Sequence, residues 1–405
     1  MSIRIKIAQN ALELNDVFRL RHQVYVEQEG VFKGTGSDEM AIVDCFDAFP
    51  PAANIIAYSG SEPIGTLRMN LDTGAGLPSE ELYDFGDYRK QITDEWEEKH
   101  GESPCFMSGG LLAISFDWRN RRDVLRALLK MGAGIGHSWS ATHVIATPSV
   151  KSYTLYKRLG FERIDEDQQI ESIGDSIVPM VAKFEDYYSW AFGDLTKNKK
   201  FLDIFADRFQ WLILGSGETL FKEDDEGQDA YIIDSGTVRI LRRVEETGEE
   251  PTLATLGQGD LFGELSLIDA KPRSARAMAL TNTELIKLDR DDFLSRLKEQ
   301  PGYMQDMLEH CAARIRRADE LIAALHGSAV LRMDHALEDI RSSAVPDAKR
   351  PDTLLAKIGA VEFASNAGVG EQEAREYLEE QKVLQRIEFT ERRIRFLHVE
   401  NSQDS

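Results

Sequence analysis

Five residues in the second half of the chain have types and spacing that suit a bound phosphate diester. Gly263 and Glu264 precede a short predicted helix that begins at Leu265, and Arg273 and Ser274 follow that helix. The N-terminus of a helix presents backbone N–H groups to an anion, and a guanidinium binds phosphate oxygens in pairs. Glu264 can accept a hydrogen bond from a ribose hydroxyl, and Ser274 can donate one to a phosphate or a base. Together these residues predict a site for a cyclic phosphodiester.

The surrounding sequence resembles the phosphate-binding cassette of cyclic-nucleotide-binding domains, as in the Crp/Fnr regulators and the cyclic-nucleotide-dependent kinases. The resemblance is carried by FGEL followed by PRSA within residues 261–277. The segments 216–221 and 229–238 are similar to the β-roll of the same family. The resemblance implies that cAMP, or another cyclic nucleotide, is an effector of this chain.

The contacts to the base and the occupancy of this site stay open. In the Crp family, hydroxyl side chains on a long helix contact the purine, whereas the matching positions here are Ala318 and Asp319. The residues that contact the phosphate match the family and the residues that contact the base do not. We therefore expect cAMP by default. The alternative is a β-roll that has lost its ligand, in which Glu264 and Arg273 simply pair with each other.

Near the N-terminal end, Tyr156 has a spacing that suits proton transfer. It lies four residues before Gly160 and Phe161, within a predicted helix and its terminal turn. The segment 153–162 resembles the Y-x-x-x-G-F segment of the GCN5-related N-acyltransferases (the GNAT fold). In that fold a splay between two strands admits the pantetheine arm of the acyl donor. The resemblance implies that Tyr156 is a general acid that protonates the leaving thiolate; the alternative is an aromatic residue that only packs its helix.

Five further residues, which precede Tyr156 in the sequence, lie in motifs whose order resembles that of the acyl-homoserine-lactone synthases and, more closely, of the long-chain N-acyl amino acid synthases. The resemblance covers about residues 5–185. It implies an N-terminal lid and an acceptor pocket, and its matched residues are Arg21, Tyr25, Asp44, Asp47 and Arg68. We assign Arg21 and Tyr25 to the lid and acceptor pocket, and Asp44, Asp47 and Arg68 to catalysis. Two arginines and two carboxylates can bind a zwitterionic amino acid, or can form a buried ion-pair network that holds the lid to the sheet.

The same families differ from this chain at two places. They usually carry a Glu and an Arg at the start of the central strand, in the pattern E-x-S-R-L-A, and both charges are missing from 107–114. The loop 118–124, which is glycine-rich in ordinary acetyltransferases, carries Arg119, Arg121 and Arg122 instead. These arginines favour acyl-ACP over acyl-CoA as the donor, because they can meet a single pantetheine phosphate or the acidic carrier itself. The alternative is an ordinary basic helix N-terminus.

The predicted elements place these residues on separate domains. The N-terminal region mixes strands and helices. Its expected strands are 54–58, 63–69, 111–115, 143–147 and 177–184, and its expected helices are 14–27, 121–132 and 151–159. Residues 206–297 change to short β segments punctuated by glycine, which predicts a small barrel or roll.

A long helix is predicted from Pro301, with apolar residues spaced alternately by four and three. These are Met304, Leu308, Cys311, Ile315, Ala318, Ile322 and Leu325. That spacing predicts a dimer coiled coil, and a core helix of one subunit is the alternative. Residues 330–400 resemble the Crp-type winged helix-turn-helix, but the presumed recognition helix at 370–385 holds five glutamates against one arginine and one lysine. This charge disfavours binding to DNA.

The sequence thus predicts a multidomain α+β protein with five parts. These are a GNAT-like N-acyltransferase domain (1–185), a helical linker (186–205), a cyclic-nucleotide-binding β-roll (206–300), a dimerisation helix (301–328) and a degenerate winged helix-turn-helix (329–405).

Composition and cysteine usage favour a cytoplasmic protein that does not bind polyanions. The chain has 405 residues and a formal net charge of −22, which repels polyanions. It has three cysteines, Cys45, Cys105 and Cys311, and no CxxC motif, so neither a disulfide framework nor a metal site is expected. No apolar segment is long enough for a membrane span or resembles a signal peptide. We expect a homodimer in the cytoplasm.

The expected function is a cyclic-nucleotide-regulated N-acyltransferase. It would move an acyl group from acyl-ACP or acyl-CoA to a primary amine, with an amino acid as the leading acceptor. Two alternatives remain. One is a cAMP-responsive Crp/Fnr-like transcriptional regulator with a catalytically dead acyltransferase sensor domain. The other is a cAMP-regulated protein lysine acyltransferase.

Overall fold

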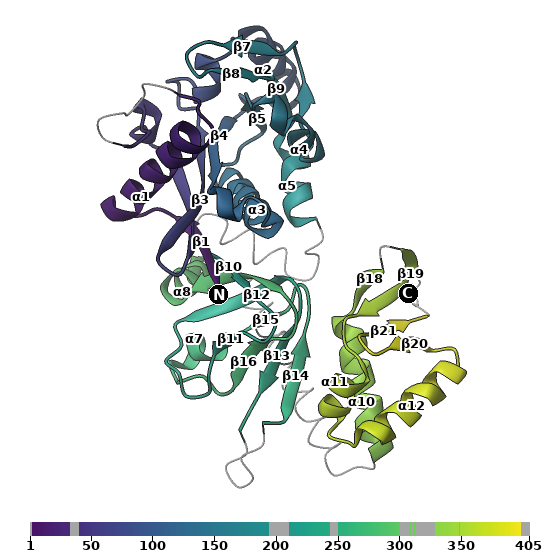
Figure 1. Ribbon diagram of the computed structural model, residues 1–405. Coiled ribbons are helices and arrows are strands. Elements are labelled where there is room, and N and C mark those ends of the chain that lie inside the picture. The colour runs from purple at the N-terminus through teal and green to yellow at the C-terminus, as the bar shows by residue number, and fades with distance from the viewer. Residues whose placement is uncertain are drawn as a thin grey trace. The chain divides into compact units, whose positions relative to one another are not determined.

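The computed structural model describes residues 2–32, 40–193, 210–243, 250–299, 308, 312, 329–347 and 349–397. The chain divides into two units, Met1–Ile213 and Leu214–Ser405, which are described separately (Figure 1). Both units combine helices with sheets, which confirms the predicted multidomain α+β class.

The first unit is built on a mixed sheet in which β1 to β5 are neighbours in chain order, followed by β9 and β6. The pairings among these strands are antiparallel except β4 with β5, which is parallel. The strands are β1 (Ile3–Ile7), β2 (Ala52–Ser59), β3 (Glu62–Leu71), β4 (Phe106–Ile114), β5 (His143–Ala146), β6 (Glu162–Arg163) and β9 (Met180–Lys183).

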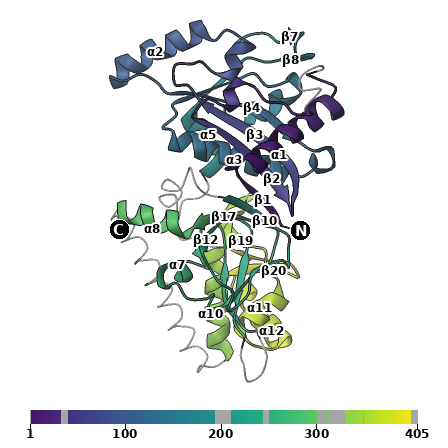
Figure 2. The same ribbon diagram turned by 90° about the vertical axis from the view of Figure 1, so that its left-hand side faces the viewer.

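Helices α1 (Ala11–His22) and α3 (Arg122–Ser138) cover opposite faces of this sheet (Figure 2). Side chains alternate along β3, as they must in a strand. Leu67 and Met69 face α3, where a Cβ on Gly132 would lie 3.4 and 3.0 Å from their side chains. Arg68 and Asn70 face the other side, where the Asn70 amide donates to the Phe46 carbonyl at 2.9 Å.

The Gly-rich second half of α3 corrects the prediction that this helix ends at Gly132. The helix continues to Ser138 because Gly132 and Gly136 allow a close approach to the sheet and to α5 (Phe184–Phe192). A Cβ on Gly136 would lie 2.5 Å from the Phe184 ring and 2.6 Å from the sulfur of Met107. Packing therefore overrides the low helix propensity of glycine.

Three other predicted boundaries change, and one helix was not predicted. The helix expected over 14–27 is α1 continued by a π-helix, η1 (Gln23–Gln28). The central strand begins at Phe106 rather than Leu111. The strand expected over 177–184 is divided at Pro179, with β8 (Asp175–Ile177) pairing to β7 (Gln168–Ile170) instead of the main sheet. Helix α2 (Gly86–His100) was not predicted, because its apolar stripe is short and its members, Tyr88, Ile92 and Trp96, are only partly buried.

The second unit begins with the predicted β-roll. One layer has the strand order β15-β12-β17 and the other has β11-β16-β13-β14. The roll also contains β10 and helices α7 and α8. Their bounds are β10 (Gln210–Leu214, across the unit boundary), β11 (Thr219–Phe221), β12 (Asp229–Ser235), β13 (Val238–Leu241), β14 (Thr252–Leu256), β15 (Leu261–Phe262), α7 (Leu265–Asp269), β16 (Arg276–Ala279), β17 (Thr283–Asp289) and α8 (Arg290–Glu299).

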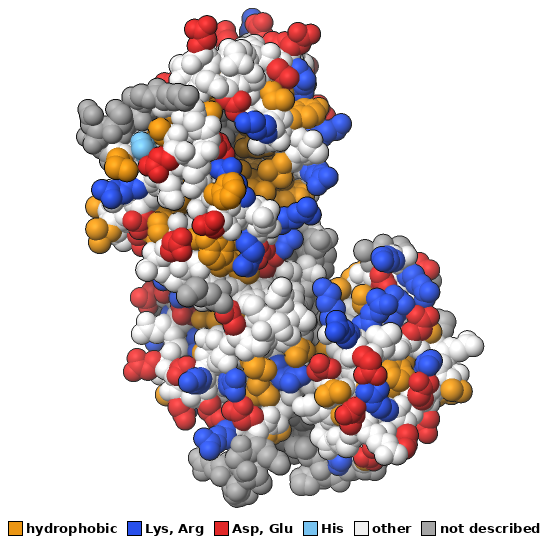
Figure 3. Space-filling model, viewed as in Figure 1, with side chains coloured by type: hydrophobic (Ala, Val, Ile, Leu, Met, Phe, Trp, Pro, Cys, Tyr) orange, Lys and Arg blue, Asp and Glu red, His pale blue; other side chains and the backbone are white. Residues whose placement is uncertain are grey.

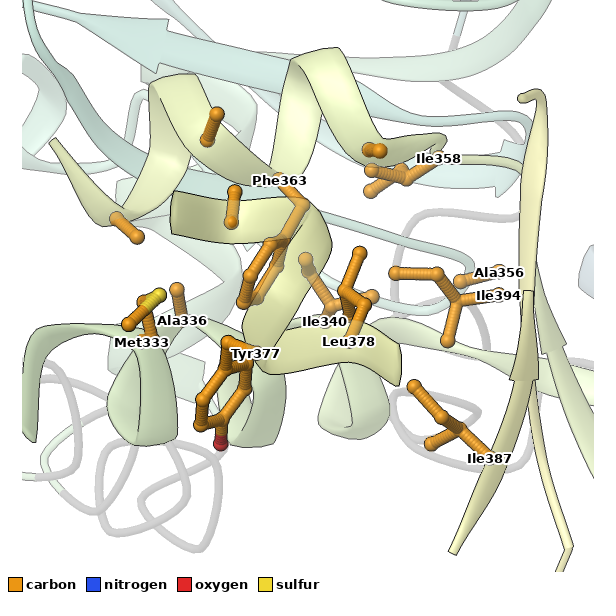
Figure 4. Packing of buried hydrophobic residues seen from close by; sticks show 14 of the residues in the cluster. Met333, Ala336, Ile340, Ala356, Ile358, Phe363, Tyr377, Leu378, Ile387 and Ile394 are labelled. Carbon is orange, nitrogen blue, oxygen red and sulfur yellow. The ribbon is translucent and has the colours of Figure 1, made fainter. Parts of the chain in front are cut away.

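The C-terminal part of the second unit is a three-helix module with a four-stranded sheet in the order β18-β19-β21-β20. Its elements are α10 (Ala329–Ser343), β18 (Val345–Asp347), β19 (Arg350–Ala356), α11 (Ala360–Ala367), α12 (Glu371–Val383), β20 (Ile387–Thr390) and β21 (Arg393–Phe396). Figure 4 shows Phe363, Tyr377 and Leu378 in its core, which the helices share with the sheet. A left-handed Gly368 turns α11 into α12. The helix-turn-helix and the C-terminal hairpin are confirmed, whereas the β18–β19 hairpin was not predicted.

Two expectations fall mainly outside the described residues. Apart from Leu308, the seam of the dimerisation helix lies there, as do Ala318 and Asp319 and most of the linker. Within the described segments, no helix is long and apolar enough to cross a membrane.

Candidate functional site

Strands β4 and β5 part near the middle of β4, at the position where the acyl donor is expected. The two strands pair only from Phe106 with His143 to Ser108 with Ile145, although β4 continues to Ile114. Beyond Ser108 the sheet is therefore open between them. In Figure 3 a hollow with an apolar floor opens on this part of the first unit.

Tyr156 of α4 (Tyr153–Arg158) lines a small cavity beside this opening. The cavity has a volume of about 20 Å³, about the size that holds one water molecule. Its other walls are Leu67, Met69, Gly109, Leu129, Val144, Ala146, Leu159, Phe161 and Tyr187. Tyr156 is 8% exposed, and burial raises the pKa of its hydroxyl to about 12. The hydroxyl makes no hydrogen bond to another described residue, so its proton is available for transfer at neutral pH.

A bulge interrupts β4 next to this cavity. Opposite Leu67 the strand carries an extra residue, and Leu111 there has a left-handed backbone with φ of 51°. Tyr25 of η1 donates a hydrogen bond to the Leu112 carbonyl at 2.9 Å. Burial and the nearby Glu29 and Tyr156 raise the pKa of Tyr25 above its ordinary value. The lid segment is thus anchored to a strained turn of the central strand, a feature that clusters at functional sites.

Arg21, Asp47, Arg68 and Asp44 form one ion-pair network. Arg21 Nη1 lies 3.0 Å from an Asp47 carboxylate oxygen, and Arg68 Nη1 lies 3.0 Å from Asp47 and 2.6 Å from Asp44. Arg21 also donates to the Asn54 side chain. The side chains of both arginines and of Asp47 are at most 3% exposed, whereas that of Asp44 is 39% exposed. All four members therefore pair with one another, and Asp44 is the one among them that reaches solvent.

Burial raises the pKa of Asp47, but the two guanidinium groups outweigh it and hold the pKa below its ordinary value. Burial lowers the pKa of Arg21, and the Asp47 charge opposes that shift. This network lies on the α1 face of the sheet with Arg68, whereas Tyr156 lies on the α3 face with Leu67. The structure thus brings Arg21, Asp44, Asp47 and Arg68 together on one face of the sheet and places Tyr156 on the other.

The three loop arginines are exposed at the start of α3. Arg119 lies 2.9 Å from Glu29, and Arg121 lies 2.7 Å from Asp123. Arg122 is the first residue of α3 and makes no ion pair with another described residue. Two of the three charges are therefore already engaged by carboxylates.

In the β-roll, Arg273 is buried within the cassette, with an exposed fraction of 5%. It donates to the carbonyls of Gly263 and Asp229, both at 2.7 Å, and to the Ser266 hydroxyl at 2.8 Å. Its guanidinium lies 4.2 Å from the centre of the Phe221 ring, and its Nε has no hydrogen-bond partner among the described residues. Burial lowers the pKa of Arg273 below its ordinary value.

The rest of the cassette lies around this guanidinium. Glu264 is fully buried just before α7, Gly263 has a left-handed φ of 77°, and Leu265 and Ser274 are exposed. Sequence reasoning missed Ser266, Phe221 and Gly227, which surround Arg273. The sequence showed Gly227 only as one of several glycines in predicted turns, yet a Cβ there would lie 2.5 Å from Arg273 Nε. The fold was needed to show that Gly227 lies against Arg273.

The acidic helix α12 keeps its cations paired. Arg375 contacts both Glu371 and Glu391 at 2.9 Å, and Lys382 lies 3.0 Å from Glu379. Figure 3 shows that Lys and Arg side chains of this module gather over the β18–β19 hairpin rather than over α12. On the C-terminal hairpin, Arg395 is itself paired with Asp347.

Comparison with known proteins matches two regions of the chain to known families. Residues 16–183 match the family model "N-acyl amino acid synthase FeeM", and residues 212–300 match "Cyclic nucleotide-binding domain". The chain therefore joins a FeeM-like acyltransferase region to a Crp-like cyclic-nucleotide-binding β-roll, as its sequence predicts. Together the two domains support a cyclic-nucleotide-linked N-acyltransferase.

Individual relatives match parts of the chain. The cyclic AMP receptor protein of Thermus thermophilus is 40% identical over 118 residues, which are 29% of this chain and 54% of that protein. A CRP-like cAMP-activated global transcriptional regulator of Mycobacterium tuberculosis is 38% identical over 109 residues, 27% of this chain and 48% of its own length. The chain thus spans about half the length of the curated relatives it matches. The solved structure of FeeM, from uncultured soil microbes, is 16% identical with a TM-score of 0.38, over 47% of this chain and 96% of that one; the assignment depends on the family match and not on this superposition.

Proposed function

We propose that the first unit transfers an acyl group from a thioester, acyl-ACP or acyl-CoA, to the amine of an amino acid, and that a cyclic nucleotide bound to the β-roll regulates the transfer. The observation that carries this proposal is the parting of β4 from β5 beside the buried, protonated Tyr156. A thioester in that opening can be approached by an amine from the opposite face of the sheet.

In the proposed reaction the amine lone pair attacks the thioester carbonyl carbon. A backbone N–H at the β4 bulge donates to the oxyanion that forms, as fixed dipoles do in acyl transfer. When the intermediate collapses, the C–S bond breaks and the Tyr156 hydroxyl gives its proton to the thiolate. The acceptor ammonium loses one proton to solvent before its nitrogen attacks. The nitrogen loses a second proton as the amide forms, and that proton passes through water to the Tyr156 phenolate and restores the hydroxyl.

The charged residues receive different roles in this proposal. Arg119 and Arg122, at the start of α3, bind the donor phosphate. Asp44, the solvent-accessible member of the network, binds the acceptor ammonium. Arg21 and Arg68 position Asp44 and the turn around it, because their own charges are already paired by Asp47. A protein lysine is the alternative acceptor, since Asp44 would bind its ammonium equally well.

The proposed effector is cAMP, which both curated relatives carry in their names. Arg273 and the backbone at the start of α7 would bind its phosphate, and Glu264 its ribose. Arg273 must then exchange part of its bonding to Gly263 and Ser266 for the phosphate oxygens. The predicted seam at 301–328 leads us to propose that the chain acts as a cytoplasmic homodimer.

Mass spectrometry of lipid extracts tests the function. Cells would make the wild-type chain, Tyr156→Phe or Arg273→Ala, with equal protein levels checked by immunoblot. An N-acyl product made by the wild type and strongly reduced in Tyr156→Phe supports the enzyme and names its acceptor and chain length. Absence of an N-acyl product from all cells contradicts amino acid acylation, and equal product in the wild type and Tyr156→Phe contradicts the general-acid role of Tyr156.

A second function is favoured by one observation, the complete winged-helix topology of the C-terminal module. A regulator of transcription would use α12 on DNA, but that helix presents glutamates to a polyanion. We therefore propose that this C-terminal module contacts other domains of the protein and does not bind DNA. An electrophoretic shift on random duplex DNA at low salt, with and without cAMP, distinguishes the two, because binding would support the regulator.

A further inference from the structure

The segment 23–29, which we name the strap, crosses the end of the central strand in an unusual conformation. Residues Gln23–Gln28 form a π-helix, and the Glu29 amide donates to the Val24 carbonyl at 3.0 Å, five residues back. π-Helical turns are rare and are found frequently at functional sites. This conformation suggests that the strap does more than connect α1 to the rest of the lid.

Three side chains fasten the strap to the end of β4 and to the segment between β4 and α3. Tyr25 donates to the Leu112 carbonyl at 2.9 Å, and the Phe116 amide donates to the Gln28 side chain at 3.1 Å. The third contact is the ion pair of Glu29 with Arg119 Nη2 at 2.9 Å. The first two contacts bind backbone, whereas the third occupies a cation that the proposed function assigns to the donor phosphate.

The geometry of Arg119 makes Glu29 a competitor of that phosphate. Its Nε donates to the Ile114 carbonyl at 3.3 Å, so the guanidinium is oriented by the end of β4. A carboxylate and a phosphate use the same donor edge of a guanidinium. The side chains of Arg119 and Glu29 are each 36% exposed, so the pair is exchangeable and weak.

We propose that Glu29 determines the affinity for phosphate-bearing acyl donors by holding Arg119 until the pantetheine phosphate replaces its carboxylate. The replacement frees the strap from one of its three anchors when the donor binds. This inference rests on the proposed acyl-transfer function and names phosphopantetheine, as part of the donor, as the group that Arg119 recognises.

The test compares Glu29→Gln with Glu27→Gln in the full chain. Glu27 is also on the strap and loses the same charge, but its partner is His22 at 3.2 Å rather than an arginine of the loop. Binding of 4′-phosphopantetheine and of phosphate-free pantetheine is measured by calorimetry. Kinetics are then measured with the acylated form of each.

For Glu29→Gln we expect the Kd for phosphopantetheine and the KM for its acyl form to fall about two- to fivefold, the range for an exposed ion pair. Pantetheine should bind both variants and the wild type alike. The shift should shrink in high salt. Equal Kd values in Glu29→Gln and the wild type, no binding by Glu29→Gln, the same shift with pantetheine, or the same shift in Glu27→Gln would each overturn the proposal. Failure of the acyl-transfer function itself shows differently, as absent turnover of every acyl donor whatever the binding data.

Discussion

Replacing Tyr156 by phenylalanine removes one oxygen from the cavity and leaves the packing of the ring unchanged. The ring contacts Phe161 at a centroid distance of 5.2 Å, and phenylalanine preserves that contact. Because the hydroxyl makes no hydrogen bond to another described residue, no partner is left unsatisfied. We expect the free energy of unfolding to change by less than about 1 kcal/mol.

The rate of acyl transfer should respond much more strongly. A positioned general acid contributes about 10²- to 10⁴-fold, so kcat should fall at least about 100-fold, or roughly 2.7 kcal/mol of transition-state stabilisation. The donor KM should change little because the hydroxyl acts on the leaving sulfur. Since burial raises the pKa of Tyr156 to about 12, it stays protonated as the pH rises. The wild-type kcat should therefore show no loss from tyrosine ionisation up to about pH 10, where an unperturbed tyrosine would be half ionised.

Tyr187→Phe provides a contrasting variant in the same cavity. The Tyr187 hydroxyl donates to the Leu129 carbonyl at 2.5 Å, so its loss removes a buried hydrogen bond. We expect about 1 kcal/mol of lost stability and a kcat within about threefold of the wild type. The assay is steady-state acyl transfer followed by free thiol, together with thermal unfolding of each variant. Wild-type kcat in a stable Tyr156→Phe would refute the general-acid role and make Tyr156 a packing residue.

Three further predictions concern stability and the effector. Gly136→Ala should destabilise the first unit by about 1–3 kcal/mol in urea unfolding, because its Cβ would lie 2.5 Å from the Phe184 ring; wild-type stability would mean that α3 shifts freely. With cAMP at one hundred times the wild-type Kd, thermal unfolding should show about 2.7 kcal/mol of stabilisation in the wild type and none in Arg273→Ala; equal stabilisation would exclude Arg273 from the site. The lowered pKa of Asp47 means that its contribution to stability is complete above its unfolded pKa of about 4 and is lost as the pH falls through its lower folded value. Asp47→Asn should therefore cost about 3–5 kcal/mol at pH 7 and progressively less in acid, and a cost independent of pH would contradict this account.

The sequence predicts those features of this protein that depend on residues close together in the chain. The nucleotide cassette lies within one contiguous segment. The types and spacing of Gly263, Glu264 and Arg273 are therefore enough to predict a nucleotide site. The helix-turn-helix is similarly local, because a glycine turn between two helices needs no distant partner. Both features appear in the structure where the sequence places them.

The acyl-transfer region depends on contacts between distant segments. Asp44, Asp47 and Arg68 were predicted to act in catalysis with Tyr156, and strand alternation places Arg68 on the face of β3 opposite to Leu67, which lines the Tyr156 cavity. The pairing of Glu29 with Arg119 joins residues far apart in sequence, which no local pattern signals. Likewise, α3 continues through its glycines because Phe184 and Met107 pack closely against Gly136.

The sequence by itself therefore determined the domain types and the identity of the charged and aromatic groups, since these follow from short patterns of residues. Only the tertiary structure decided which charges neutralise one another, which face of the sheet each side chain occupies, and where β4 parts from β5. The physical reason is that an ion pair or a strand opening is a relation between segments, and its energy depends on distance and burial, which the folded chain alone sets.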